Sequence, residues 1–299
     1  MKTWIVTGGN RGLGFQIARH LACVDEDRVV LAVRDPALGR SAAAAIGPNV
    51  SAMPLDLSRR DSVRQFIEHW QGRIDGLVNN AGTQIGNAFR TTDDGLEQTF
   101  AVNHLHTLEL TLGLLPALRG GRVVFIGSGT HNPRHPTARL GGFRGERFVS
   151  IENAAGGLEQ SDNHEQLGKD RYATSKFLNL VTMVELARRI AAEITRFACL
   201  DPGLMPGTGL ARTSPALWRF GWHYVLPVAA RVLPDASTPK RSGRAVAELL
   251  RRPDPSFGHG VIYDYKGAPS RRIIERVYDP AIGRAVIDDS LQLLGRESI

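Results

Sequence analysis

The sequence predicts a single-domain α/β protein built on a doubly wound sheet of seven mostly parallel strands. Short apolar runs alternate with helix-length amphipathic stretches along nearly the whole chain, which is typical of a parallel sheet covered by helices on both faces. Two of these runs, residues 4–6 and 123–126, are continuously apolar, as expected of strands buried on both sides. A glycine-rich run at residues 7–14 follows the first strand and opens a helix, the arrangement of a nucleotide-binding Rossmann-type sheet.

The expected elements follow each other at regular spacing. The strands are residues 3–7, 28–33, 50–55, 76–78, 122–126, 195–200 and 260–263. The helices are residues 12–24, 35–46, 58–70, 93–118 with a break, 171–194 and 237–251. Two stretches, an insertion at about 130–170 and an apolar, aromatic segment at about 203–234, interrupt this rhythm. We interpret both as excursions from one domain spanning residues 1–299.

The composition and charge limit the kinds of binding partner that we expect. Hydrophobic residues make up 42% and charged residues 22% of 299 residues, as in ordinary globular proteins. The net charge is +7, but no block of five or six like charges appears, which argues against a nucleic-acid partner. Cys23 and Cys199 stand in apolar surroundings and are expected to be buried and reduced, and no metal-ligand spacing is present. The chain begins directly with a strand and no signal peptide, so we expect a cytoplasmic protein.

The run T-G-G-N-R-G-L-G predicts a phosphate-binding loop. Glycines let the backbone turn tightly and approach a pyrophosphate at a helix N-terminus. The alternative is a glycine-rich turn without a ligand. The candidate cofactor-binding residues of this loop are Thr7, Gly8, Asn10, Arg11, Gly12, Leu13 and Gly14.

The end of the second strand favours NADP over NAD. An acidic residue about 20 positions after the glycines would bind the ribose of NAD, but Val33 and Arg34 stand there. A guanidinium at this place can pair with the 2′-phosphate of NADP, and Arg11 would join it. Asp35 is expected to cap the helix that begins at Pro36. The alternative for Arg34 is an exposed charge at a strand end.

Two further strand ends carry candidate cofactor contacts. Asp56 and Leu57 follow the third strand, where Asp56 would either lie beside the adenine or serve as a helix-cap neighbour. Asn80, Ala81 and Gly82 follow the fourth strand, where small residues let the chain pass close to the cofactor ribose.

Tyr172 and Lys176 are four residues apart on a predicted helix and therefore share one face. Reduction of a ketone needs a proton donor beside the carbonyl oxygen, and a free tyrosine has a pKa near 10. A neighbouring ammonium lowers that pKa, so the pair makes chemical sense, although Y-x-x-x-K alone also occurs in helices without function.

Taken together, T-G-x-x-x-G-x-G, N-N-A-G, an Asn, a Ser and Y-x-x-x-K in this order resemble the short-chain dehydrogenases/reductases from Lys2 to about Asp264. The resemblance implies that Tyr172 donates or accepts the substrate proton. It implies that Lys176 lowers the tyrosine pKa and binds the nicotinamide ribose, and that Ser128 orients the carbonyl.

The same resemblance implies a role for Asn103, which would hold a water in a proton relay. It also implies that Pro202 and Gly203 touch the nicotinamide end. The run at 94–105, the run at 202–210 and the C-terminal segment at 278–295 resemble the subgroup of retinol dehydrogenases and light-dependent protochlorophyllide reductases.

Three departures from the family pattern stand out: Gly127 replaces a common serine, His106 replaces a glycine, and Ser128 and Tyr172 lie 44 positions apart. A comparable insertion occurs in monomeric carbonyl reductases and in protochlorophyllide reductases. In many relatives the tyrosine-bearing helix forms a dimer interface that such an insertion would cover, so both a monomer and a homodimer stay open.

Two features bear on the substrate. The segment 218–224 contains four aromatic residues and is too short to span a bilayer, which leaves a hydrophobic substrate lid, a membrane-surface contact or core packing. His131, His135 and His164 are expected to be solvated loop residues, with substrate contact as the alternative.

These patterns predict an NADP(H)-dependent oxidoreductase that transfers hydride between nicotinamide and the carbonyl or alcohol carbon of an apolar or aromatic small molecule, such as a secondary metabolite. One alternative is different chemistry on the same fold, such as epimerisation, dehydration or reduction of a carbon–carbon double bond. The other is a catalytically silent NADPH-binding regulatory protein.

Overall fold

The computed structural model describes residues 1–86, 88–158, 163–205, 235–254 and 256–299. The apolar runs form one seven-stranded sheet in the order β3-β2-β1-β4-β5-β6-β7, with every neighbouring pair parallel. The strands are β1 (Thr3–Thr7), β2 (Arg28–Val33), β3 (Val50–Pro54), β4 (Gly76–Asn79), β5 (Gly121–Ile126), β6 (Thr195–Asp201) and β7 (Val261–Asp264). The predicted doubly wound α/β fold is confirmed. Its strand order reverses between β1 and β4, so a ligand crevice is expected at their carboxyl ends.

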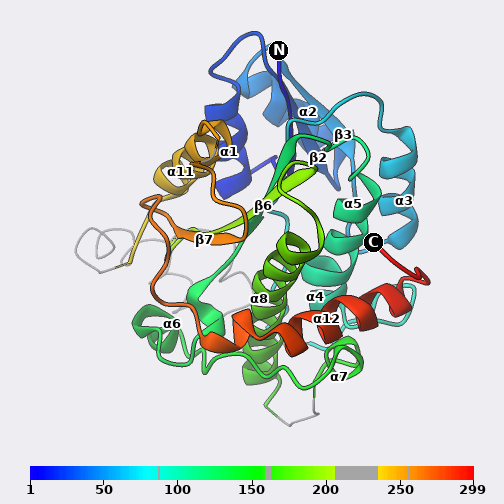
Figure 1. Ribbon diagram of the computed structural model, residues 1–299, viewed down its shortest axis with the longest axis vertical. Coiled ribbons are helices and arrows are strands. Elements are labelled where there is room, and N and C mark those ends of the chain that lie inside the picture. Colours follow the sequence, from blue (N-terminus) through cyan, green and yellow to red (C-terminus); the bar gives the residue numbers. More distant parts are fainter. Residues whose placement is uncertain (87, 159–162, 206–234, 255) are drawn as a thin grey trace.

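Helices cover both faces of the sheet (Figure 1). One face carries α1 (Gly12–Leu21), α2 (Pro36–Ile46) and α11 (Pro239–Arg251). The other carries α3 (Arg60–His69), α5 (His106–Gly113) and α8 (His164–Arg189). Two separate hydrophobic clusters, one on each side of the sheet, result from this layering.

Two helices differ from their predicted bounds. The expected helix at 171–194 is α8, which begins seven residues earlier and ends at Arg189. The expected broken helix at 93–118 is shorter: it comprises α4 (Gln98–Phe100), a π-helical turn at Ala101–Leu105 and α5. A hydrophobic repeat of 3.6 residues carries no signal for a π turn, which has a different backbone spacing.

The insertion contains a 3₁₀ turn (Gly129–His131), α6 (Pro136–Leu140), α7 (Ile151–Ala155) and the first turns of α8. After β7 the chain forms a second 3₁₀ turn (Glu275–Tyr278) and α12 (Pro280–Leu293). Most of the expected lid, residues 206–234 with the 218–224 stretch, lies outside the described part of the chain. Among the described helices, none has the length and apolar character needed to cross a bilayer.

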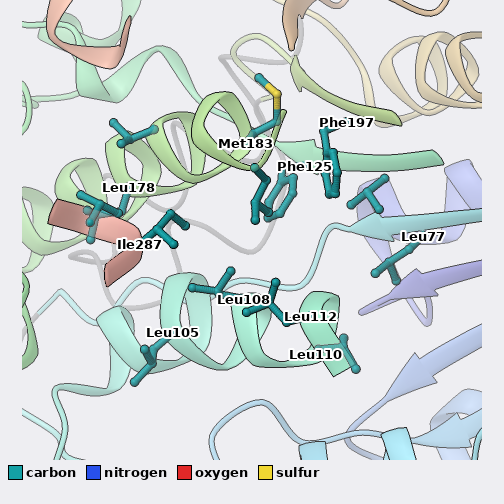
Figure 2. Close-up of a cluster of buried hydrophobic side chains, with 14 of the residues drawn as sticks. Leu77, Leu105, Leu108, Leu110, Leu112, Phe125, Leu178, Met183, Phe197 and Ile287 are labelled. Atoms are coloured by element: carbon teal, nitrogen blue, oxygen red, sulfur yellow. The ribbon is translucent and has the colours of Figure 1, made fainter. Parts of the chain in front are cut away.

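The larger hydrophobic cluster joins α5 and α8 to the sheet and to α12 (Figure 2). Leu108 and Leu112 of α5 face Phe125 of β5 and Ile287 of α12 in this cluster. The tyrosine-bearing helix is therefore fixed between the sheet and the C-terminal helix, which holds its side chains in place at the sheet edge.

Candidate active site

The first and fourth strand ends are joined by the hydroxyl of Thr7. This hydroxyl donates to Val78 O (3.2 Å) and accepts from the amides of Asn80 (3.0 Å) and Ala81 (2.9 Å). The Asn80 side-chain amide donates in turn to Thr7 O (2.8 Å). These bonds fix the N-N-A-G segment against the glycine loop.

The glycine loop has the shape of a phosphate cradle. Gly8 and Gly12 have φ angles of +64° and +57°, which favour glycine. A Cβ on Gly12 would meet no heavy atom of the described residues within 4 Å, whereas a Cβ on Gly14 would lie 2.5 Å from Gly8 O. The loop therefore packs closely on its inner side and is open on its outer side. Asn10 and Arg11 lie in this loop, and Leu13 is buried beneath it.

The N-terminus of α1 suits an anion. No side chain of the described residues caps it, and its first turn holds no acidic residue, so its amide groups are available to a phosphate. Together with the open side of Gly12, this arrangement fits a dinucleotide.

Asp35 caps a helix, and its neighbour Arg34 is exposed. The Asp35 carboxylate accepts from the amides of Ala37 (2.9 Å) and Leu38 (3.1 Å) and thereby caps α2. Arg34 is exposed at the end of β2, and within the described ranges its guanidinium forms no ion pair. Its charge is therefore available to a ligand at this edge.

Asp56 and Leu57 form a turn after β3. Asp56 accepts from the amide (2.9 Å) and hydroxyl (2.7 Å) of Ser58, a bond compatible with both of the roles predicted for it. Leu57 is buried, and its carbonyl accepts from Nδ1 of His106 (2.8 Å). His106, the departure from the family's glycine, thus supports the turn from below, and its Nε2 lies 3.3 Å from Asp94.

Tyr172 and Lys176 lie on α8 beside the end of β5. Lys176 Nζ donates to Ile126 O (2.9 Å) and stands 5.8 Å from the centroid of the Tyr172 ring. The Ser128 side chain lies close enough to the Tyr172 hydroxyl to lower its pKa, and it accepts from the Thr130 hydroxyl (3.1 Å). The structure therefore brings the predicted serine, tyrosine and lysine together.

Asn103 lies in the π-helical turn. Its side chain accepts from Thr83 N (2.7 Å) and donates to Thr83 O (2.9 Å) and to the Ser175 hydroxyl (2.9 Å). A Cβ on Gly82 would lie 3.2 Å from the Asn103 oxygen and 3.8 Å from Lys176 Nζ. Gly82 thus stands between the two side chains. Sequence reasoning missed Thr83 and Ser175, which have no motif position of their own.

Burial sets the protonation of the pair. It raises the pKa of the Tyr172 phenol, with the Asp201 carboxylate adding to the rise and the Ser128 side chain opposing it. Burial lowers the pKa of Lys176 to about 8. The pKa of the phenol is thus raised, mainly by loss of hydration, and Lys176 is not among the groups that shift it. The lowering of this pKa by Lys176 stays a prediction.

Pro202 and Gly203 follow β6 at the same edge. Pro202 O accepts from the Ser242 hydroxyl (2.7 Å), and Gly203, with φ +72°, donates its amide to the Asp201 carboxylate (3.0 Å). Asp201 also influences the pKa values of Tyr172 and Lys176. Its acidic side chain directly before Pro-Gly was the available signal, and sequence reasoning did not use it.

His131 and His135 are not solvated loop residues as predicted. Their exposed fractions are 1% and 6%, because the 3₁₀ turn and α6 pack them against the site. His164 is exposed, as predicted. Cys199 is buried as expected, but Cys23 is exposed. Within the described ranges, no group of three or more His, Cys, Asp or Glu side chains is placed to hold a metal.

A parallel sheet with an open glycine loop, and a serine, a tyrosine and a lysine at its carboxyl edge, define a dinucleotide-dependent oxidoreductase. The model of the short chain dehydrogenase family matches residues 2–138. A chloroplastic protochlorophyllide reductase of Pisum sativum is 30% identical over 318 residues, which cover 97% of this chain and 77% of the relative. The chain belongs to the short-chain dehydrogenase/reductase family, whose members use NAD(P)(H).

Solved structures show the same fold. A crystal structure of an uncharacterized protein from Mycobacterium paratuberculosis is 27% identical, with a TM-score of 0.73 over 100% of this chain and 95% of that one. An active-site complex of Pseudomonas aeruginosa RhlG with NADP is 23% identical, with a TM-score of 0.61 over 89% and 95%. The likeness thus extends over the whole of this chain, including the insertion.

Proposed function

We propose that this protein is an NADPH-dependent oxidoreductase that transfers hydride between nicotinamide and the carbonyl or alcohol carbon of an apolar or aromatic small molecule. The observation that carries the proposal is the buried Tyr172 side chain, which lies beside the Lys176 ammonium and close enough to Ser128 for that side chain to affect its pKa. Two hydroxyls held together at the carboxyl edge can both donate to one carbonyl oxygen.

The protonation states favour the reduction direction. NADPH, when bound, supplies the hydride. Because the pKa of Tyr172 is raised, the phenol carries its proton at neutral pH and can give it to the oxygen as negative charge develops there. The Lys176 ammonium then lies close to the phenolate that remains and stabilises it. Ser128 holds the same oxygen in place throughout.

The preference for NADPH rests on Arg34. An exposed guanidinium without an ion-pair partner in the described ranges suits a dianionic 2′-phosphate. The carboxylate of Asp35, the neighbour of Arg34, is directed to the amides of α2. Arg34 and the open glycine loop together support NADP(H) rather than NAD(H).

Tyr172→Phe tests the proposal. The variant keeps the ring and loses the proton donor, so kcat should fall about 10²- to 10⁴-fold while NADPH binding, followed by cofactor fluorescence, stays within about twofold. Tyr278→Phe, which changes a tyrosine outside the site, is the matched control. Undiminished turnover of Tyr172→Phe across a carbonyl and alcohol panel would refute the assignment.

Reduction of a carbon–carbon double bond is a second candidate, favoured by the similarity to protochlorophyllide reductases. Mass spectrometry of products formed with NADPH deuterated at C4 of the nicotinamide separates the two. Deuterium on the carbinol carbon indicates carbonyl reduction. Deuterium on a saturated carbon next to an intact carbonyl indicates double-bond reduction.

A further inference from the structure

His131 has a fixed tautomer. Its Nδ1 lies 2.7 Å from Ser128 O, and a carbonyl oxygen only accepts, so Nδ1 must carry the proton. Burial lowers the pKa of this imidazole, which keeps the ring neutral at physiological pH. Its Nε2 therefore presents a lone pair and acts as an acceptor.

The ring lies beside the reacting groups. Ser128, whose carbonyl accepts from the imidazole, has its side chain close enough to the Tyr172 hydroxyl to affect its pKa. The Asp201 carboxylate is near enough to influence the pKa values of both His131 and Tyr172. His131 and Tyr172 thus share two neighbours, one at the end of β5 and one at the end of β6.

The Nε2 acceptor of His131 is buried and has no hydrogen-bond partner among the described residues. An unsatisfied buried polar group is destabilising, so such a group in a native site calls for an explanation. Asp201 cannot supply the missing donor, because a carboxylate only accepts. A ligand that brings its own hydroxyl or N–H group would satisfy Nε2.

We propose that His131 Nε2 accepts a hydrogen bond from a donor group on the substrate, and that the substrate is therefore a ketone or aldehyde with a hydroxyl or N–H group near the reacting carbonyl. This inference rests on the proposed function and narrows it. Ser128 and Tyr172 donate to the carbonyl oxygen, and His131 accepts a hydrogen bond from the second polar group. An apolar substrate without a donor leaves the acceptor unpaired and is bound less well.

Matched pairs of ketones test the contact. The probes are 2-hydroxyacetophenone with 2-methoxyacetophenone, and 3-hydroxy-1-phenylpropan-1-one with its methyl ether. Each ether keeps the ketone, the chain and the ether or hydroxyl oxygen, adds one methyl group and loses the donor. For at least one pair, kcat/KM of the hydroxyketone should exceed that of the ether by about tenfold or more.

His131→Asn separates a contact with substrate from a structural role. The asparagine amide can still donate to Ser128 O but offers nothing at the Nε2 position. The hydroxyl-to-ether ratio should fall to near one in this variant. A merely structural role would lower both members of a pair equally and leave the ratio unchanged, which would overturn the proposal. His164→Asn, which alters an exposed histidine, should keep the wild-type ratio.

A measurement without turnover keeps this inference apart from the proposed function. Nitrogen-15 NMR of histidine-labelled protein, with His131→Asn to assign the signal, should show the neutral Nδ1–H tautomer at pH 7.5. In the presence of NADP⁺, the hydroxyketone should shift the Nε2 resonance, and its ether should not. An Nε2–H tautomer, or equal responses to both compounds, overturns the role of His131. Absence of any ketone turnover by the wild type instead overturns the proposed function.

Discussion

At the scale of single residues, the pKa values of Tyr172 and Lys176 are shifted in opposite directions. Both are buried, and burial raises the pKa of the phenol and lowers that of the ammonium. Each group is thereby moved toward its neutral form, because loss of hydration disfavours charge of either sign. An active site that keeps such groups does so at a cost in stability.

Lys176→Met should reveal this cost. In the folded protein the lysine pKa is about 8, below its ordinary value of 10.5. Below pH 8 the lysine is charged in both the folded and the unfolded state, and its burial is unfavourable. Between pH 8 and 10.5 only the unfolded state binds the proton, so the stability of the wild type rises with pH. The cofactor-free variant should be more stable by about 1–3 kcal/mol at pH 7, with a gain that shrinks toward pH 10.5.

Urea unfolding of the wild type and Lys176→Met at pH 7, 8.5 and 10 measures the difference. The variant should also lose turnover, since the lysine belongs to the site. A variant that is less stable at pH 7, or whose difference from the wild type is the same at all three pH values, contradicts the buried-charge account.

Arg34→Ala tests the cofactor preference at one position. The variant should raise the KM for NADPH about tenfold or more and leave the KM for NADH nearly unchanged. Arg40→Ala, which removes an exposed arginine from the neighbouring helix α2, is the matched control for net charge. Equal changes for both cofactors, or equal effects of the two variants on NADPH, would exclude a 2′-phosphate contact at Arg34.

At the scale of elements, the strands and the site motifs are predictable and the local distortions are not. All seven strands follow from short apolar runs, because a parallel strand buried on both faces leaves a continuous apolar signature. Thr7 ends β1, and Asn80, Ser128 and Pro202 follow β4, β5 and β6. Parallel strands place their carboxyl ends at one edge. That edge could be located from the sequence.

The π-helical turn and the buried histidines could not be predicted. Asn103 owes its position to the turn at Ala101–Leu105, which leaves no mark in hydrophobic spacing. His131 and His135 stand in a polar, irregular stretch, and only the packing of that stretch against the site buries them. The raised tyrosine pKa depends on burial in the same way, and burial is not visible in the local sequence.

The junction of α5, α8 and α12 contains a buried histidine with a pH-dependent role. His104 Nε2 lies 2.9 Å from the Ser290 hydroxyl, and burial lowers its pKa to about 3. Between pH 6.5 and 3 the unfolded state binds a proton that the folded state does not, so stability falls as the pH falls through this window. The slope should approach about 1.4 kcal/mol per pH unit.

His104→Gln measures this contribution, because it keeps a polar side chain but cannot titrate. The wild type should lose more stability than the variant between pH 7.5 and 5, as followed by urea unfolding. Parallel stability curves for the two proteins over that interval would show that His104 does not carry the effect.

At the scale of the whole molecule, α12 covers the tyrosine-bearing helix (Figure 1). Val286, Ile287 and Leu291 of α12 belong to the same hydrophobic cluster as the side chains of α8. A Cβ on Gly283 would lie 2.6 Å from the Glu185 carboxylate, so the two helices approach closely there. Arg189 of α8 forms an ion pair with Asp288 of α12 (2.6 Å).

This cover predicts a monomer. Nearly every residue of α8 from Leu167 to Leu186 is already buried within one chain, whereas a dimer through this helix would need an exposed apolar face of about 800 Å² on each partner. The insertion adds to this cover: Phe148, Ile151, Ala154 and Ala155 belong to the same hydrophobic cluster, and the Phe148 ring packs on Phe177 of α8. Light scattering coupled to size exclusion at micromolar concentration should give a mass near 32.6 kDa. A stable dimer would mean that another surface associates. A dimer that Asp288→Arg disrupts would contradict the intramolecular docking of α12 itself.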